Sequence, residues 1–396
     1  MMKFIHTSDW HLGQSFMGKS RAEEHDAFLS WLTEAIKEHE VDALLVSGDV
    51  FDTGTPPNYA LELYYNFLKK LSHIKTLKTT IITAGNHDSV STLKAPKQLL
   101  EALNVHVVTS GGEDEDIIIP IKKEGEIKAL VCAVPYLRDS VIRHSLSGET
   151  VSDKEKLANE GIKAYYHNIH TQATTFKKEI YIPIIAMGHL TTLGSVTSES
   201  ERDIYIGGAL DIGGDYLGDL FDYVALGHLH INQTVKHNHV RYSGSPIPLS
   251  FSESANTKKV NLVTITDKVE VEELDIPTKR TLMVIKGNLE SIKDELKIIE
   301  DKTAWIEVYI RDDNPMFANS EIRELASTLG LTLLAVRVEK SQKEIDKKEL
   351  KAISLDELKV IDVFERRLEL EGIEDEEFKQ ELKNEFNIIA SRVESR

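Results

Sequence analysis

Five short apolar runs share one pattern, which constrains the fold of this chain more than any other feature of its sequence. Each run is rich in β-branched residues, ends in a small residue and is followed at once by aspartate, asparagine or histidine. The five are KFIHTSDWH from Lys3, DALLVSGDVFD from Asp42, TTIITAGNHD from Thr79, IPIIAMGH from Ile182 and FDYVALGHLH from Phe221. Open α/β-type sheets bind ligands beyond the carboxyl ends of their strands. The pattern therefore predicts five strands that deliver polar side chains to one common site.

The segments between the first three runs have helical spacing. Residues 23–39 place Phe28, Leu32 and Ile36 on one face, and residues 56–71 open with two prolines suited to a helix start. After position 180 the apolar runs alternate with turns more than with helices. We therefore expect an α/β (α+β) fold whose core is a two-sheet β-sandwich flanked by helices.

Length and composition narrow the class of protein. The chain has 396 residues, which suggests two or three domains. It has no run of about 18 apolar residues and no secretion-type start, so we expect neither membrane association nor export. Its one cysteine, Cys132, follows an apolar run and is expected to pack there as a small hydrophobe. The cytoplasm is the compartment that fits these features.

The formal net charge of −18 limits how the chain can meet nucleic acid. It argues against coating by bulk electrostatics, because that mode of binding needs a basic face. Bound metal ions or a partner subunit can supply positive charge instead. The net charge therefore does not exclude an enzyme that acts on nucleic acid.

The polar residues after the five runs are oxygen and imidazole donors, which are typical metal ligands. Such donors suit Mn²⁺, Fe²⁺, Mg²⁺ or Zn²⁺ and disfavour a thiolate-bound structural zinc. Seven donors exceed the need of one ion, whereas two ions about 3.5–4 Å apart that share a carboxylate would use them all. Glycines before four of the donors are expected to allow tight turns. For any one motif taken alone, a satisfied structural residue is the alternative. The seven are Asp9, His11, Asp49, Asn86, His189, His228 and His230.

The order DWH, GDVFD, GNHD, GH and GHLH resembles the five motifs of the calcineurin-like metallophosphoesterases. The fuller stretches HTSDWHLGQSF, VSGDVFDTGTPPNYA, AGNHDSV and YSGSPIPLSFSE are similar to those of the SbcD-type nucleases. This family supplies the nuclease subunit of a bacterial complex that processes double-strand breaks and hairpins. The resemblance is dense over residues 1–255.

The resemblance implies roles for individual residues. The first metal ion would be held by Asp9, His11, Asp49 and His230, and the second by Asp49, Asn86, His189 and His228. His87 would protonate the leaving oxygen, with Asp88 and Asp52 orienting it. A plain turn or cap role is the alternative for Asp88. Arg138 in VPYLRD, together with Lys94 and Lys97 just after the third motif, are candidates to contact a DNA backbone, solvated surface charge being the alternative.

The implied activity is that of a metal-dependent DNA nuclease, both double-strand exonuclease and single-strand or hairpin endonuclease, in DNA repair and recombination. The implied cofactors are two divalent ions, with Mn²⁺ preferred over Mg²⁺ or Fe²⁺. The partners would be DNA ends and hairpins and an SbcC-type ATPase. Two rivals are a metallophosphoesterase acting on a small phosphodiester or phosphoprotein, and a non-catalytic scaffold that keeps a metal site.

We expect a nuclease domain over residues 1–278, followed by smaller units. Residues 279–339 read as a βαβαβ unit in which Gly330 ends the second helix, similar to the capping domain of the SbcD-type nucleases. Residues 340–354 are a charged linker. Residues 355–396 carry two amphipathic helices expected to bind the coiled coil of the ATPase, with docking on the nuclease domain as the alternative.

The segment 58–71 carries more aromatic surface than one buried stripe requires. The resemblance implies that two copies pair through helices at this level, as a homodimer within a heterotetramer. We therefore expect Tyr64 and Phe67 to lie in a two-fold contact, where charged substitutions would give a folded monomer. Packing of these rings on the sheet is the alternative.

Overall fold

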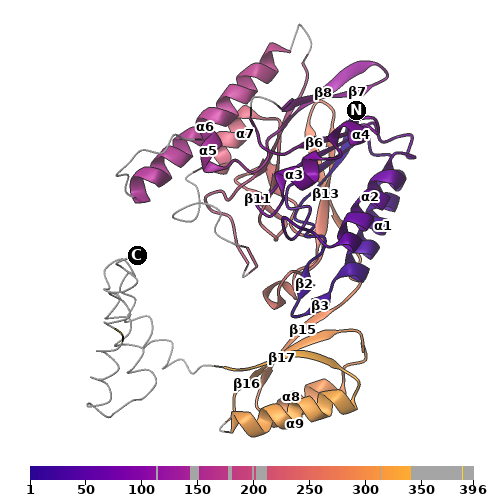
Figure 1. Cartoon of the computed structure of the whole chain (residues 1–396), viewed down its shortest axis with the longest axis vertical. Helices are drawn as coiled ribbons and strands as arrows, with labels where there is room; N and C mark the ends of the chain where they lie inside the picture. Colours follow the sequence, from indigo (N-terminus) through magenta and orange to yellow (C-terminus); the bar gives the residue numbers. More distant parts are fainter. Residues whose placement is uncertain are drawn as a thin grey trace. The chain divides into compact units, whose positions relative to one another are not determined.

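The computed structural model describes residues 1–112, 115–142, 151–176, 181–198, 200–201, 212–312, 314–339 and Phe386. Residues 1–337 form one compact unit, and Figure 1 shows its elements in sequence colours. None of the helices within the described ranges has the length and apolar character needed to cross a membrane.

The first of two six-stranded sheets has the order β14-β13-β1-β4-β5-β6. Strands β1, β4, β5 and β6 are parallel, and β13 runs antiparallel to β1. Three of the five predicted strands, β1, β4 and β5, are therefore neighbours that end at the same edge. The bounds are β1 (Met2–Thr7), β4 (Ala43–Ser47), β5 (Thr79–Thr83), β6 (Val105–Val108), β13 (Lys259–Ile265) and β14 (Val269–Asp275).

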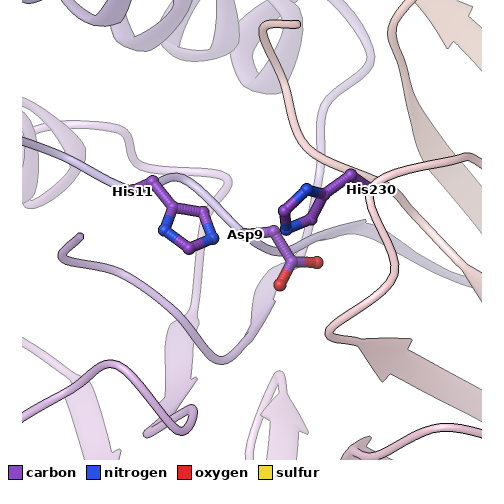
Figure 2. A group of neighbouring side chains, drawn as sticks. All are labelled: Asp9, His11 and His230. Carbon is purple, nitrogen blue, oxygen red and sulfur yellow. The ribbon is translucent and has the colours of Figure 1, made fainter. Parts of the chain in front are cut away.

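The second sheet has the order β11-β12-β10-β9-β8-β7. Its strands β9 and β10, the other two predicted, are parallel neighbours. The segments after β1 and β10 bring Asp9, His11 and His230 together (Figure 2). The bounds are β7 (Ile118–Lys123), β8 (Glu126–Ala133), β9 (Ile184–His189), β10 (Tyr223–Gly227), β11 (Gln233–Val235) and β12 (His237–Tyr242).

The two sheets pack face to face, as the predicted sandwich requires. Alternate residues of the first sheet, among them Phe4 and Leu45, form one buried cluster with Val131 and Met187 of the second. The opposite faces of β1, β4 and β5 place Ile5, Leu44 and Ile82 in a different buried cluster, in keeping with the period of two along a strand. The predicted fold class is confirmed.

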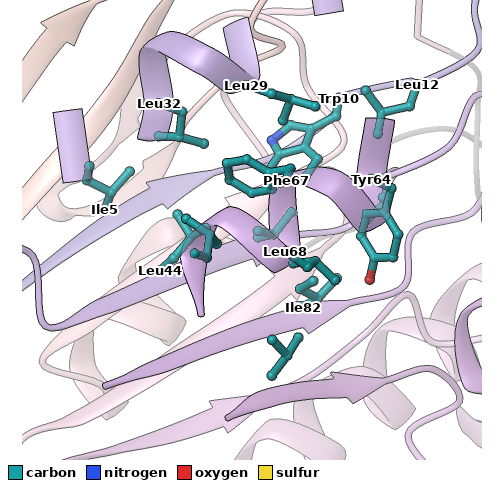
Figure 3. Close-up of a cluster of buried hydrophobic side chains, with 14 of the residues drawn as sticks. Ile5, Trp10, Leu12, Leu29, Leu32, Leu44, Tyr64, Phe67, Leu68 and Ile82 are labelled. Carbon is teal, nitrogen blue, oxygen red and sulfur yellow. The ribbon is translucent and has the colours of Figure 1, made fainter. Parts of the chain in front are cut away.

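Helices α1 (Ala22–Glu38) and α2 (Asn58–Leu71) cover the outer face of the first sheet. Figure 3 shows the cluster between them and the sheet. Tyr64 and Phe67 are 1% and 2% exposed in it, and Phe67 packs edge-on against Trp10 with ring centroids 5.5 Å apart. The prediction that these two rings form a two-fold contact is therefore wrong, because the core already buries them.

Helix α6 (Val151–Thr175) covers the outer face of the second sheet and was not predicted. Ile162 and Tyr166 lie in its buried cluster with Leu130 and Ala186. The helical spacing of Ala158, Ile162, Tyr166, Ile169 and Ala173 is the signal that could have found it. Shorter helices are α3 (Val90–Lys94), α4 (Lys97–Glu101), α5 (Asp139–Ile142) and α7 (Gly214–Leu220).

After β14, the chain has the predicted βαβαβ order. Its three strands form a separate sheet, β15-β16-β17, with a buried cluster of its own. Asn288 and Asn314 accept hydrogen bonds from main-chain N–H groups of the first helical turns, and Gly330 adopts a φ of +68° after the second helix. The bounds are β15 (Leu282–Gly287), α8 (Leu289–Lys297), β16 (Trp305–Ile310), α9 (Pro315–Thr328) and β17 (Thr332–Val338).

A small contact region joins this unit to the two-sheet core. It uses the hairpin β2 (Ser15–Phe16) and β3 (Lys19–Ser20) and the 3₁₀ turn η1 (Phe251–Glu253). Phe16 stacks on Trp305 at a centroid distance of 5.8 Å and an interplanar angle of 7°. The predicted linker and tail helices lie outside the described residues, Phe386 apart.

Candidate metal centre

The candidate ligands lie on unusual backbone immediately after the strands. Asp9, His11 and Asp49 have φ values of 53°, 46° and 48°, and His228 has 94°. Such values are uncommon for residues with a side chain and cluster at functional sites. Glycines are expected at such turns, yet here the candidate ligands themselves adopt the left-handed conformation.

The glycines before the ligands mostly provide space. Gly48 has a positive φ of 85°, as expected. At Gly85, a Cβ would lie 2.1 Å from the Asp49 Oδ1 atom, and at Gly227 it would lie 1.8 Å from the Ser47 carbonyl oxygen. These glycines therefore allow neighbouring strand ends to approach so closely that their side chains share one site.

The structure brings the seven candidate ligands into adjoining groups. Asp9, His11 and His230 form one group, drawn in Figure 2, and their ligand atoms lie within 4.8 Å of one another. A second group is Asp49, His189 and His228. Asn86 belongs with it, since its Oδ1 lies 2.9 Å from Nε2 of His189.

Asp49 lies between the two groups. Its Oδ2 is 3.6 Å from Nε2 of His11 and 3.4 Å from Nε2 of His189. Its Oδ1 accepts a hydrogen bond from the main-chain N–H of His87 at 2.9 Å. One carboxylate is thus within reach of ligands from both groups.

Three of the imidazoles have Nδ1 occupied by the protein. Nδ1 of His11 lies 3.2 Å from Asp52 Oδ1, that of His189 lies 3.0 Å from the Ser47 carbonyl oxygen, and that of His230 lies 2.5 Å from Ser200 Oγ. Each ring therefore offers Nε2 to an ion. Nε2 of His11 is buried without any hydrogen-bond partner among the described residues, which is costly unless a ligand occupies it. This donor set, rich in imidazole and carboxylate, suits a dimetal site.

The electrostatics of the centre favour cations. Burial raises the pKa of Asp49, but the imidazoles of His189 and His11 outweigh it and hold the pKa well below its usual range. Burial lowers the pKa of His189, but the Asp49 carboxylate raises it to about 9. Burial lowers the pKa of His228 well below its ordinary value. A cation that binds His189 must therefore displace a proton.

The three predicted catalytic residues lie beside this centre. The His87 ring is 4.9 Å from the His11 ring, centroid to centroid, and its Nδ1 donates to the main-chain oxygen of Asp52 at 2.7 Å. The Asp52 carboxylate instead accepts from His11. The main-chain carbonyl of Asp52 thus holds the His87 ring, and its carboxylate forms a third group with His11 and His87 whose ligand atoms lie within 4.8 Å of one another. That the carboxylate also orients His87 stays a prediction.

Asp88 makes main-chain contacts of the kind expected for its alternative role as a turn or cap residue, and its part in orienting His87 stays a prediction. Its carboxylate accepts hydrogen bonds from the main-chain N–H groups of Val50, Phe51 and Gly85, at 2.8–3.1 Å. It therefore ties the loops after β4 and β5 together, and any effect on the His87 ring is indirect. Burial and the nearby Asp49 charge raise the pKa of Asp88 to about 6, against those hydrogen bonds.

The predicted DNA-contacting side chains are not part of the metal groups. Arg138 is exposed. Lys94, 39% exposed, lies 3.6 Å from the Glu115 carboxylate. Lys97 is half-buried on α4.

Several residues that hold the ligands in place were not predicted from the sequence. They include Ser200, which is hydrogen-bonded to His230, Glu253, which accepts a hydrogen bond from Ser200, and the carbonyl of Ser47 beside His189. Serine carries no metal signature, so residue type gave no indication of Ser200. Glu253 ends the stretch YSGSPIPLSFSE, whose presence was the available signal.

Known proteins similar to this chain agree with this geometry. The family model described as calcineurin-like phosphoesterase matches residues 2–232, and that described as type 5 capsule protein repressor C-terminal domain matches residues 278–372. The chain is 40% identical to the SbcD subunit of the nuclease SbcCD of Escherichia coli K12 over 393 residues, 97% of each chain.

Two further relatives carry the same name. The Bacillus subtilis protein is 31% identical over 365 residues, 90% of this chain and 91% of the relative. The Rhodobacter capsulatus protein is 36% identical over 284 residues, 70% and 69% of the two chains. With a phosphoesterase match over more than half its length and nuclease subunits matched almost end to end, this chain belongs to the SbcD family of metal-dependent nucleases.

Proposed function

We propose that the chain hydrolyses phosphodiester bonds at DNA ends and hairpins with two divalent ions, as the nuclease partner of an SbcC-type ATPase. The observation that carries the proposal is the place of Asp49, whose Oδ2 lies within 3.6 Å of an imidazole nitrogen from each ligand group. The names of the relatives, subunits of SbcCD nucleases, support the partner and the reaction.

In this proposal the ligands divide into two sets that share Asp49. Asp9, His11 and His230 complete the first set. Asn86, His189 and His228 complete the second. When bound, the two cations supply Lewis acidity, which lowers the pKa of a water molecule and neutralises charge on the phosphate oxygens. Mn²⁺ is the ion we assign, because the set mixes imidazole with carboxylate and amide oxygen, and Mg²⁺ or Fe²⁺ are the alternatives.

His87 is the proposed general acid. Its Nδ1–H is held by the Asp52 carbonyl, so Nε2 is the nitrogen that can carry and release a proton. The backbone of His87 is also held in place, since its main-chain N–H donates to Asp49 Oδ1. A proton from Nε2 would go to the leaving oxygen of the cleaved strand.

The finer parts of the proposal concern the rest of the chain. Arg138, Lys94 and Lys97 are proposed to contact the DNA backbone, supported only by charge and by their positions after the third motif and β8. The division at 278/279 is supported by the separate sheet and core of the β15–β17 unit. The tail is proposed to bind the ATPase, and two copies of the chain to pair in the complex.

The test is a nuclease assay on linear and hairpin DNA with Mn²⁺, Mg²⁺ or EDTA, with and without the ATPase. We expect cleavage with Mn²⁺, none with EDTA, and stimulation by the ATPase with ATP. Hydrolysis of bis(p-nitrophenyl) phosphate without cleavage of any DNA would instead favour a small-phosphodiester hydrolase.

A further inference from the structure

A hydrogen-bonded chain of side chains leads away from the Nδ1 atom of His230. Ser200 Oγ lies 2.5 Å from this Nδ1 and also donates a hydrogen bond to Glu253 Oε1. A carboxylate only accepts hydrogen bonds, so the Ser200 proton must point to Glu253. The oxygen of Ser200 is then left to accept, and the proton between the two residues belongs to His230.

Glu253 is built into the core as a fixed anion. Its side chain is 0% exposed, and Oε2 pairs with the ammonium of Lys258, which is 7% exposed. Ser198 Oγ donates to Oε1 at 3.1 Å, and the main-chain N–H of Leu249 donates to Oε2 at 3.2 Å. A buried carboxylate with this many donors stays ionised and immobile.

We propose that Glu253, acting through the Ser200 hydroxyl, is a positioning residue that holds His230 as its Nδ1–H tautomer and so presents Nε2 to the first metal ion. A neutral imidazole has one donor and one acceptor nitrogen, so fixing the donor fixes the ligand atom. The inference rests on the proposed role of His230 as a ligand. It gives the stretch YSGSPIPLSFSE, which Glu253 ends, a function at the metal centre.

The three fixed imidazoles differ in what holds them. His11 is held by a carboxylate and His189 by a main-chain carbonyl, whereas the hydrogen bond at Nδ1 of His230 goes to the Ser200 hydroxyl, with carboxylate oxygens of Glu253 and Glu201 farther away at 3.7 and 4.0 Å. Without that hydroxyl, the nearest acceptor for Nδ1 of His230 is the Glu253 carboxylate at 3.7 Å, which is beyond hydrogen-bond distance. A substitution at Ser200 should therefore weaken the binding of one metal ion and leave the binding of the other unchanged.

The experiment is a Mn²⁺ titration of the metal-free full-length chain. Binding is measured by calorimetry and by the electron paramagnetic resonance signal of free Mn²⁺. Ser200→Ala should weaken one of the two binding steps about 10–100-fold, the usual effect of losing a partner of a ligand, and leave the other step unchanged. Ser200→Thr keeps the hydroxyl and should restore binding. The unfolding temperature of the metal-free protein should be similar in all three.

Ser198→Ala is the matched control. It removes a hydroxyl that donates to the same Glu253 oxygen and lies 2.7 Å from Ser200 Oγ, but that has no hydrogen bond to His230 among the described residues. It should bind both ions like the unaltered chain. Equal weakening in Ser198→Ala and Ser200→Ala would overturn the proposal, because the effect would then come from the loop as a whole. Normal binding by Ser200→Ala would also overturn it.

A third variant separates this inference from the proposed function. His230→Ala should lose one ion. If it does while Ser200→Ala binds both ions normally, the Glu253 relay is wrong and the ligand assignment stands. If His230→Ala still binds two ions with unaltered affinity, the ligand assignment itself is wrong. Glu253→Gln is a weaker test, since it also leaves buried Lys258 without its counter-charge.

Discussion

At the scale of single residues, the centre depends most on Asp49, which lies between both ligand groups. Asp49→Asn should weaken the binding of both ions, because a neutral amide bridges two cations poorly. His11→Ala should weaken mainly the binding of the first ion. Metal content by mass spectrometry and the rate of DNA cleavage measure both effects. Unchanged stoichiometry and rate in Asp49→Asn would contradict the bridging role.

His87 offers a separate test, of chemistry without binding. His87→Gln should keep both ions and DNA affinity, yet lower turnover about 10²-fold or more, as expected for a lost general acid. Its side chain contacts the Asp52 carbonyl and belongs to neither ligand set. Single-turnover cleavage and metal analysis on the same preparation give the answer. A parallel loss of metal would make His87 a ligand.

The seven donors could be found from the sequence because each follows a strand whose end the pattern reveals. The residues that hold these donors in place could not be found from the sequence. Ser200 contacts Glu253 across 53 positions, and only the folded chain brings the two together. Asp88 was recognised as part of a motif, but its three main-chain partners depend on how two loops meet.

At the scale of elements, the joint between α1 and the β15–β17 unit rests on a buried ion pair. Glu24 Oε1 accepts from Nε of Arg21 and from Nε of Arg280, both at 2.9 Å. Arg21 is fully buried, and its guanidinium lies 5.3 Å from the ring centroids of both Phe16 and Trp305. The joint therefore combines charge pairing with stacking.

Glu24→Gln should lower the free energy of unfolding by about 3–5 kcal/mol, because it leaves buried Arg21 without its counter-charge. Glu23→Gln is the control, since Glu23 is largely exposed and binds only the outer side of Arg280 at 3.1 Å. Glu23→Gln should lower the free energy of unfolding by about 1 kcal/mol or less. Urea denaturation compares them, and equal effects would show that the buried pair does not stabilise the joint.

Element types were more predictable than the faces that they bury. The five strands and α1, α2, α8 and α9 follow from periodicity, which is a local property. The aromatic surplus on α2 was assigned to a second copy of the chain, yet Trp10 and Phe51 meet Phe67 and Tyr64 inside the core. Neither Trp10 nor Phe51 lies on α2, so the spacing of residues along α2 could not indicate these contacts.

At the scale of the whole molecule, nuclease chemistry and ATPase binding are proposed to lie on different parts of the chain. Every ligand candidate lies within residues 9–230, whereas the proposed ATPase contact lies beyond 354. Removing the residues from Lys340 onward should therefore separate the two. The shortened chain should keep Mn²⁺-dependent cleavage and lose capture of the ATPase.

Point variants test the same separation in the full-length chain. The helical spacing of the tail predicts that Phe364 and Leu382 lie on apolar faces, where each buried side chain contributes roughly 1.5–3 kcal/mol. Phe364→Glu with Leu382→Glu should thus abolish a micromolar or tighter complex and, with it, ATP-stimulated cleavage. Gln380→Glu with Asn384→Glu adds the same two charges where the spacing predicts the polar face, and should still bind. ATPase capture by the chain cut at Lys340 would place the contact on another surface and leave the tail as an intramolecular packing element.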